Sequence, residues 1–464
     1  MNKRANFATR LGAILAAAGS AVGLGNIWRF PCETGANGGA AFILVYIFCI
    51  AFITVPVLIA ELAAGRESRT NVYDAFRTLP KKTILGRHGR IVWTFVGAMC
   101  VLAGFLVFSY YSVVAGWTLQ YTVEAGIDSF AGKTSAQFAA DFNTFISDPV
   151  RPALPMLAFI VTTTVIVTLG VQRGIELASK VMMPLLLVLL GVLACCSLTL
   201  PGASAGLEFL FKPDFSKITP QVAISALGQA FFTLSVGMGC LMTYASYFSD
   251  KVNIVKDAFS VAFIDSCVAI LAGVIIFPAA MSVGVSPDTG PTLVFITLPN
   301  VFQQAFGATP WLCYGVTVLF YLLLVMAALT STISMLEITT AFVSEKFGQS
   351  RRKSPVMLGT ITCVAGFACS MSFGNWSDIT LFGMGFFDLF DYFVAKLVMP
   401  IGNLHVSAHA QSGQGESGVN AYEQRHIAPP QICRSVLFSR QLGHPCAHHA
   451  DIPERAERIE SWCV

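Results

Sequence analysis

Several polar or ionisable side chains lie inside long apolar stretches, where such groups are costly to bury. They are Asn26, Gln229, Thr233, Ser235, Asp265, Thr330 and Ser331. All carry oxygen atoms, and hard alkali cations bind the oxygens of amides, hydroxyls, carboxylates and carbonyls. An isolated Ser or Thr commonly bonds to its own helix backbone, whereas the carboxylate of Asp265 requires a cation or an aqueous cavity. The pattern predicts a cation site at membrane depth.

The composition identifies the elements that must hold these side chains. Of 464 residues, 55% are hydrophobic and 12% are charged, against roughly 25% charged in soluble domains. Apolar runs of about 20 residues, each long enough to cross a hydrocarbon core of roughly 30 Å, account for the excess. Runs such as Leu185–Ala194 do not alternate, which excludes an outer-membrane barrel. We therefore expect an all-α integral membrane protein whose environment is the lipid bilayer, with no nucleic-acid partner.

Ten apolar segments are predicted to be membrane helices. They lie near residues 10–33, 39–63, 91–124, 152–170, 175–200, 221–247, 257–284, 311–344, 355–374 and 379–402. The connection over 285–310 has no basic residue, which places it on the outer side. Its apolar run 292–306 is expected to form a re-entrant or a surface-capping hairpin.

Basic residues predict the orientation. The loop between the second and third segments contains Arg66, Arg69, Arg77, Lys81, Lys82, Arg87 and Arg90. Basic loops remain in the cytoplasm. The sequence thus predicts a multi-pass protein of the cell membrane with a cytoplasmic N-terminus.

Matching glycine-containing strings occur in the first and sixth segments, at Val22–Gly25 and Val236–Gly239. A single glycine pair is typical of close helix packing, but matched pairs in two halves predict broken helices at a binding site. The two halves, about 8–200 and 219–402, would enter the membrane from opposite sides as inverted repeats. We expect Glu61 to accept backbone N–H groups freed by such a break.

The motif residues resemble the neurotransmitter:sodium symporter family, of the bacterial amino-acid:sodium symporter type. The resemblance is carried by Ala8–Gly12 and Ala21–Pro31, by Tyr110 and Tyr111, by Phe231–Ser235 with Tyr244–Tyr247, and by Ala327–Ser331. It covers about residues 4–402. It implies a core of 5+5 inverted repeats with broken first and sixth helices. It also implies sodium-coupled symport of amino acids by alternating access, without enzymatic chemistry.

The resemblance also implies two sodium sites and one substrate site. The first sodium would bind the Ala21 carbonyl, Asn26, Thr233 and Asp265. The second would bind the Gly19, Val22 and Ala327 carbonyls with Thr330 and Ser331. The substrate site would comprise Ala21, Leu24, Gly25, Val107, Tyr111, Phe232, Thr233, Ser235, Met238, Ser334 and Met335. This mostly apolar lining favours a hydrophobic or aromatic amino acid.

Chloride dependence and gating follow from the same resemblance. Chloride-dependent relatives hold the anion near positions matching Tyr46, Gln229 and Thr233, and Asp265 stands where those relatives often have Asn. Asp265 can supply the negative charge itself, so we expect that chloride is not required. The outer side would be closed by Arg29 with Asp391, together with Tyr111 and Phe232. The inner side would be closed by Arg4, Phe7, Tyr247 and Glu345.

The sequence departs from the family pattern after Pro400. Residues 403–464 contain no further membrane-length apolar run, so we expect a disordered, non-native tail that follows a frame change near Ile401–Asn403. A truncated, non-transporting membrane protein is therefore one alternative function, and a channel is another. The sequence indicates neither the oligomeric state nor which amino acid is carried.

Overall fold

The computed structural model describes residues 6–79, 86–249, 252–284 and 293–411. Apart from an isolated bridge between Leu381 and Met384, all regular elements in these ranges are helical. Helices lie at all ten predicted segments. By length and composition, six described helices can cross a membrane, or seven if one bent pair counts as a span. The all-α membrane fold predicted from the composition is confirmed.

The first half of the chain contains the first five predicted segments. Its elements are α1 (Arg10–Ala21), η1 (Gly25–Arg29), α2 (Phe30–Ala36), α3 (Ala40–Cys49), η2 (Ile50–Thr54), α4 (Val55–Ser68), α5 (Val72–Thr78), α6 (Gly86–Gly126), α7 (Ser135–Ser147), α8 (Ala153–Thr168), η3 (Val171–Glu176), α9 (Leu177–Leu198) and α10 (Ala203–Phe211).

The second half repeats this organisation. Its elements are η4 (Phe215–Lys217), α11 (Pro220–Thr233), α12 (Cys240–Ala245), α13 (Ile254–Ser282), η5 (Leu293–Thr297), α14 (Leu298–Phe306), α15 (Pro310–Lys346), α16 (Lys353–Met371), α17 (Phe386–Tyr392), η6 (Phe393–Val398) and α18 (Met399–Gln411).

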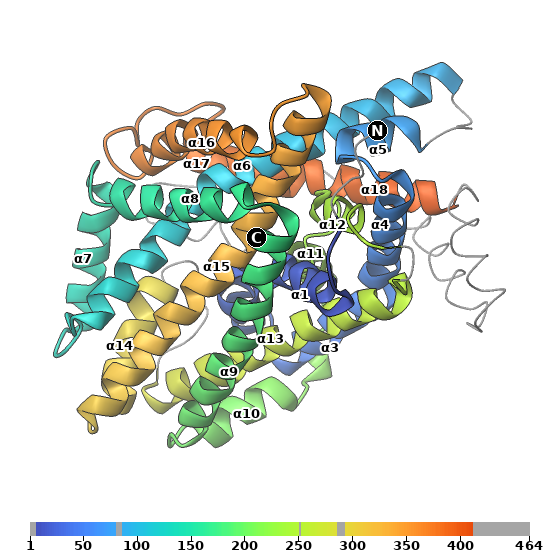
Figure 1. The fold of residues 1–464 in the computed structure, drawn as a ribbon. Coiled ribbons are helices and arrows are strands. Elements are labelled where there is room, and N and C mark those ends of the chain that lie inside the picture. The colour runs from blue at the N-terminus through green and yellow to red at the C-terminus, as the bar shows by residue number, and fades with distance from the viewer. Residues whose placement is uncertain (1–5, 80–85, 250–251, 285–292, 412–464) are drawn as a thin grey trace.

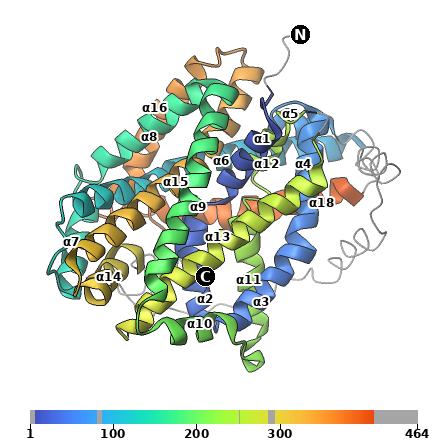
Figure 2. The same ribbon diagram turned by 60° about the horizontal axis from the view of Figure 1, so that its bottom comes forward.

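Helix α1 lies in the interior of the bundle, packed against α9, α13 and α15 (Figures 1 and 2). The long helices α6 and α15 cross the bundle and pack along each other. Large apolar side chains such as Phe95 and Phe263, 64% and 70% exposed, lie on the outside of the bundle. In a membrane protein these side chains face lipid, and the polar groups face the interior.

The first helix is broken between α1 and η1. The axes of Arg10–Ala21 and Gly25–Ala36 differ in direction by 53°. At Gly23 a Cβ atom would lie 2.5 Å from the Ser331 Oγ, and at Gly25 one would lie 2.9 Å from the Phe232 ring. Glycine is thus required here because α6, α11 and α15 approach the backbone closely.

The sixth segment is broken over residues 234–239, between α11 and α12. Gly237 and Gly239 have φ angles of +87° and +84°, which favour glycine. Glu61 on α4 accepts hydrogen bonds from the backbone N–H groups of Gly237, at 3.0 Å, and Met242, at 3.3 Å. The predicted role of Glu61 is confirmed, because its buried carboxylate satisfies donors that the break leaves free.

The apolar run predicted near 292–306 is helical from Leu293 to Phe306. Phe295 packs edge-on against Trp28 and Trp117, with ring centroids 6.4 and 5.7 Å apart. This helical pair therefore covers one end of the broken first helix.

The helix α18 corrects the predicted start of the tail. It continues to Gln411, past the expected core end at residue 402. Asn403 and Val406 are buried, and a Cβ atom at Gly402 would lie 2.0 Å from the Gly237 carbonyl oxygen. Residues 403–411 thus belong to the helical core, because α18 packs on the second break. The remainder of the predicted tail, 412–464, lies outside the described residues.

Candidate functional site

Asn26, Thr233 and Asp265 meet beside both breaks. The Asn26 side-chain nitrogen donates to the Thr233 Oγ1 at 2.8 Å and to the Asp265 Oδ1 at 2.7 Å. The Thr233 hydroxyl donates to the same carboxylate, 3.1 and 3.0 Å from its two oxygens. Three residues distant in sequence, on η1, α11 and α13, therefore form one hydrogen-bonded cluster, which we call the Asp265 cluster.

The donor set of the Asp265 cluster fits a sodium ion. All three side chains are at most 1% exposed. No Lys, Arg or His of the described chain forms an ion pair with Asp265. A buried carboxylate with only neutral neighbours favours a cation. A sodium ion there requires the Asn26 amide to present its oxygen, which now accepts from the Gly23 N–H at 3.0 Å.

A second group of oxygens lies where α1 meets α15. The Ser331 hydroxyl is 3.1 Å from the Val22 carbonyl oxygen, and the Thr330 hydroxyl is 2.9 Å from the Ala327 carbonyl oxygen. Gly19 lies against Thr330, because a Cβ atom on Gly19 would be 3.3 Å from the Thr330 Cβ. These residues, Gly19, Val22, Ala327, Thr330 and Ser331, form the neutral cluster, whose hydroxyl and carbonyl oxygens also suit sodium.

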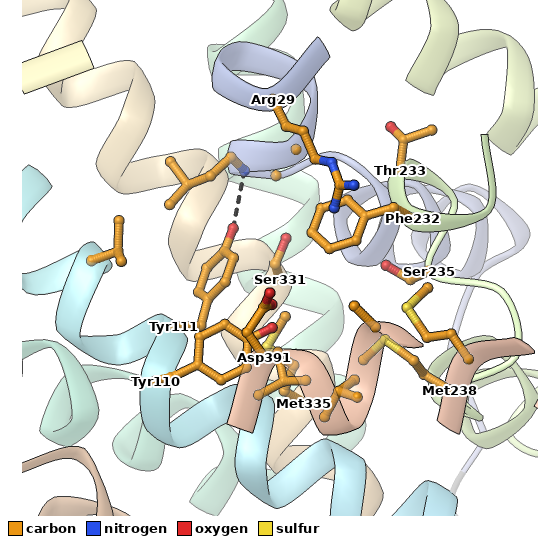
Figure 3. Close-up of a pocket in the computed structure, with 18 of the residues that line it drawn as sticks. Arg29, Tyr110, Tyr111, Phe232, Thr233, Ser235, Met238, Ser331, Met335 and Asp391 are labelled. Carbon is orange, nitrogen blue, oxygen red and sulfur yellow. Dashed lines mark hydrogen bonds between the residues drawn. The ribbon is translucent and has the colours of Figure 1, made fainter. Parts of the chain in front are cut away.

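A cavity of about 100 Å³ lies beside both breaks (Figure 3). This volume is several times the roughly 10–15 Å³ that one water molecule needs. Most predicted substrate residues line it, namely Ala21, Leu24, Gly25, Val107, Tyr111, Phe232, Thr233, Ser235, Met238 and Met335. Ser334 is not among the lining residues, since its hydroxyl donates to the Ser331 carbonyl at 2.7 Å. Trp28 and Val114 also line it and were not predicted.

The polar end of the cavity is formed by Tyr111 and the backbone of the first break. The Leu24 N–H donates to the Tyr111 hydroxyl at 3.0 Å, the dashed line in Figure 3. Gly25 begins η1, so amides with no intrahelical partner and the positive end of a helical segment lie beside the cavity. Such a position suits the carboxylate of a small solute.

Arg29 and Asp391 both line this cavity without forming an ion pair. The Arg29 guanidinium lies over the Phe232 ring, 4.5 Å from its centre (Figure 3). The Arg29 Nε is 3.7 Å from the Glu33 carboxylate. Among the described residues, no ion pair within 4.0 Å joins Arg29 to Asp391. The Arg29–Asp391 pair, which was predicted to close the outer side of the cavity, is therefore not formed in this structure.

A cluster beside the chain before α1 includes a residue missed in the sequence. Glu337 on α15 is fully buried and accepts from the Tyr247 hydroxyl and from Arg351, each at 2.5 Å. The Phe7 N–H donates to the Tyr247 carbonyl at 3.1 Å, which holds the chain before α1 in place. We call Tyr247, Glu337 and Arg351 the Glu337 cluster. Glu337 is an acidic residue at membrane depth, so the rule that selected Asp265 could have selected it too.

The predicted inner residue Glu345 lies against the chain before α5. The Glu345 carboxylate accepts from the backbone and side-chain nitrogens of Asn71, at 2.8 and 2.9 Å. Arg4 lies outside the described residues.

Comparison with known proteins gives consistent matches over almost the whole core. The model of the sodium:neurotransmitter symporter family matches residues 4–135 and 135–409. The uncharacterized sodium-dependent transporter YhdH of Bacillus subtilis (strain 168) is 41% identical over 406 residues, 87% of this chain and 87% of that protein. An uncharacterized sodium-dependent transporter of Haemophilus influenzae is 34% identical over 397 residues, 84% of this chain and 85% of that protein.

A solved structure has the same fold. The crystal structure of MhsT in complex with L-phenylalanine matches with a TM-score of 0.82 and 40% sequence identity, over 95% of this chain and 97% of that chain. This similarity supports the 5+5 inverted-repeat architecture with broken first and sixth helices. The chain thus belongs to the sodium:neurotransmitter symporter family, and it is a sodium-dependent transporter rather than an enzyme.

Proposed function

We propose that this protein is a sodium-coupled symporter of amino acids, with a preference for hydrophobic or aromatic side chains. The observation that carries the proposal is the position of the Asp265 cluster and the neutral cluster, on either side of one cavity at the two helix breaks. Sodium bound in these clusters would hold the broken segments in the arrangement that forms the cavity.

The substrate class follows from the two ends of the cavity. The amides of the first break and the Tyr111 hydroxyl suit a carboxylate. Val107, Phe232, Met238 and Met335 supply an apolar wall for the side chain. MhsT, a relative of the same fold, has been crystallised with L-phenylalanine. An apolar amino acid therefore fits both ends.

The proposed transport cycle is alternating access across the cell membrane. Arg29 and Asp391 are separate on one side, and the Glu337 cluster is closed on the other. The basic loops lie on the side of the Glu337 cluster, which we propose is cytoplasmic, together with the N-terminus. In this proposal the structure corresponds to an outward-open state of the transporter.

The decisive test is sodium-dependent binding to purified full-length protein, with a radiolabelled panel of amino acids and the Thr330→Val variant. Removal of the Thr330 hydroxyl deletes one proposed sodium ligand without changing side-chain volume. We expect the sodium concentration for half-maximal binding to rise about tenfold, equivalent to ~1.4 kcal/mol.

The matched control is Thr360→Val on α16, where the hydroxyl bonds only to its own helix, at 2.9 Å from the Val356 carbonyl. This variant should bind like the wild type. Well-folded wild-type protein that binds no amino acid, or binds equally well in potassium, would contradict the proposed function.

Chloride is not required in our proposal, because Asp265 supplies a fixed negative charge beside the first sodium. We expect wild-type binding to be equal in sodium chloride and in sodium gluconate. Asp265→Asn removes that charge, so its binding should become dependent on chloride. Asp141→Asn, at an exposed ion pair on α7, serves as the control. Binding by Asp265→Asn that is strong and indifferent to chloride would refute this assignment.

A further inference from the structure

A second hollow lies on the outer surface of the bundle, between α5 and the beginning of α6. Its volume is about 570 Å³, and Tyr73, Arg77, Arg90, Ile91, Thr94 and Phe95 line it. It shares no lining residue with the cavity at the helix breaks. We call it the α5–α6 groove.

The polar end of the α5–α6 groove has an excess of positive charge. Arg90 is exposed, and no acidic residue of the described chain forms an ion pair with it. Arg77 is 3.8 Å from Asp74, and Lys346 lies 3.9 Å from the same carboxylate. The Glu345 carboxylate lies nearby, because the Asn71 side-chain nitrogen bonds to both Asp74 and Glu345. Three cations thus face two acids, and the adjacent sequence 80–89 adds basic residues but no Asp or Glu. An anionic group would be attracted to this end of the groove.

The other end of the groove is an apolar stripe on α6. Ile91, Phe95, Ala98 and Leu102 follow a spacing of three or four residues, so they lie on one helix face. Ile91 and Phe95 are 62% and 64% exposed, and Leu102 is 45% exposed. Arg90 directly precedes the apolar run that begins at Ile91. Because basic residues flank membrane helices at the cytoplasmic interface, we place the charged end at the membrane boundary, with the stripe continuing from it into the hydrocarbon region.

We propose that the α5–α6 groove binds one anionic phospholipid. Its phosphate lies between Arg77 and Arg90, and one acyl chain follows the stripe from Ile91 to Leu102. Arginine binds phosphate oxygens through paired N–H groups, and basic pockets at the ends of membrane helices select anionic headgroups. A free phosphate ion would gain nothing from the stripe, whereas a phospholipid matches both ends of the groove.

The test is lipid retention by the full chain in nanodiscs made of equal parts phosphatidylglycerol and phosphatidylcholine, measured by native mass spectrometry. We expect the wild type to retain phosphatidylglycerol over phosphatidylcholine by roughly tenfold or more. Arg77→Gln combined with Arg90→Gln should remove this preference. The readout is lipid mass, so it does not depend on transport or on the proposed function.

Arg151→Gln is the matched control. Arg151 also pairs with an aspartate three residues before it, at 3.8 Å, but it follows α7, beyond the opposite end of α6. This variant should keep the preference. Equal retention of the two lipids by the wild type, or an unchanged preference in the double variant, would overturn the proposal. Displacement of the lipid by millimolar inorganic phosphate would overturn the part assigned to the apolar stripe.

Discussion

Glu61→Leu is expected to leave little folded protein in the membrane. Leucine is similar in volume to glutamate but cannot accept the hydrogen bonds from Gly237 and Met242. Two buried donors without partners cost about 1–3 kcal/mol each. The sum is a large part of the 5–15 kcal/mol by which proteins are typically stable. We expect the yield of monodisperse protein, measured by fluorescence-detected size-exclusion chromatography, to fall severalfold or more.

Two further variants test whether the effect of Glu61→Leu comes from the lost hydrogen bonds, from the lost charge, or from a leucine anywhere on α4. Glu61→Gln keeps one acceptor oxygen, enough for one of the two backbone donors, so its yield should lie between those of the wild type and Glu61→Leu. Glu67→Leu makes the same substitution at an exposed position of the same helix α4 and should behave like the wild type. A wild-type yield and melting temperature for Glu61→Leu would show that the second break does not depend on this carboxylate.

Glu337→Ala should release the side of the molecule that the Glu337 cluster closes. Tyr247 and Arg351 would lose their common acceptor, and the Arg351 charge would remain with no carboxylate in that cluster. Removal of one partner of a fully buried ion pair costs about 3–5 kcal/mol. The Arg351 side chain is 32% exposed, so we expect a smaller cost of about 2 kcal/mol. A cost of this size shifts an equilibrium between two states by roughly thirtyfold.

Hydrogen–deuterium exchange of the chain before α1 measures this opening. The Phe7 amide bonds to the Tyr247 carbonyl, and the Ala8 and Thr9 amides bond to Glu176, so all three are protected only while this segment stays in place. Exchange over residues 7–9 should accelerate strongly in Glu337→Ala. Tyr247→Phe, which removes one hydroxyl, should give a smaller change in the same direction. Arg352→Gln is the control, and unchanged exchange in folded Glu337→Ala would contradict the role of the cluster.

The periodicity and the motifs predicted the helices and most of the site. Apolar runs locate membrane helices well because the bilayer requires about 20 apolar residues in succession. The glycine strings located both breaks. At the first break, glycine permits the close approach of neighbouring helices to Gly23 and Gly25, and at the second it permits the positive φ angles of Gly237 and Gly239. The proximity of Asn26 and Asp265, which no local pattern encodes, was implied by the family resemblance.

The structure differs from the predictions where contacts between distant segments determine the conformation or the partner of a residue. Residues 403–411 are too polar to read as a membrane segment, but α18 is helical there because it packs on the second break. Glu345 was expected to help close the inner side, and its carboxylate accepts from Asn71 in the chain before α5, a contact between distant segments that the sequence did not indicate. Glu337 was missed because the family motif, rather than burial, guided the choice of inner residues.

The neutral cluster has a consequence for energy coupling. Its oxygens are neutral, so a sodium ion bound there would keep its full charge. A sodium ion beside Asp265 would also transfer one net charge per cycle, because the carboxylate stays in the protein. Movement of one elementary charge through 100 mV is worth about 2.3 kcal/mol. Each uncompensated charge per cycle would let the membrane voltage alone raise the accumulation ratio of the solute by roughly fiftyfold. Uptake should then be electrogenic, and the resting potential would contribute to it along with the sodium gradient.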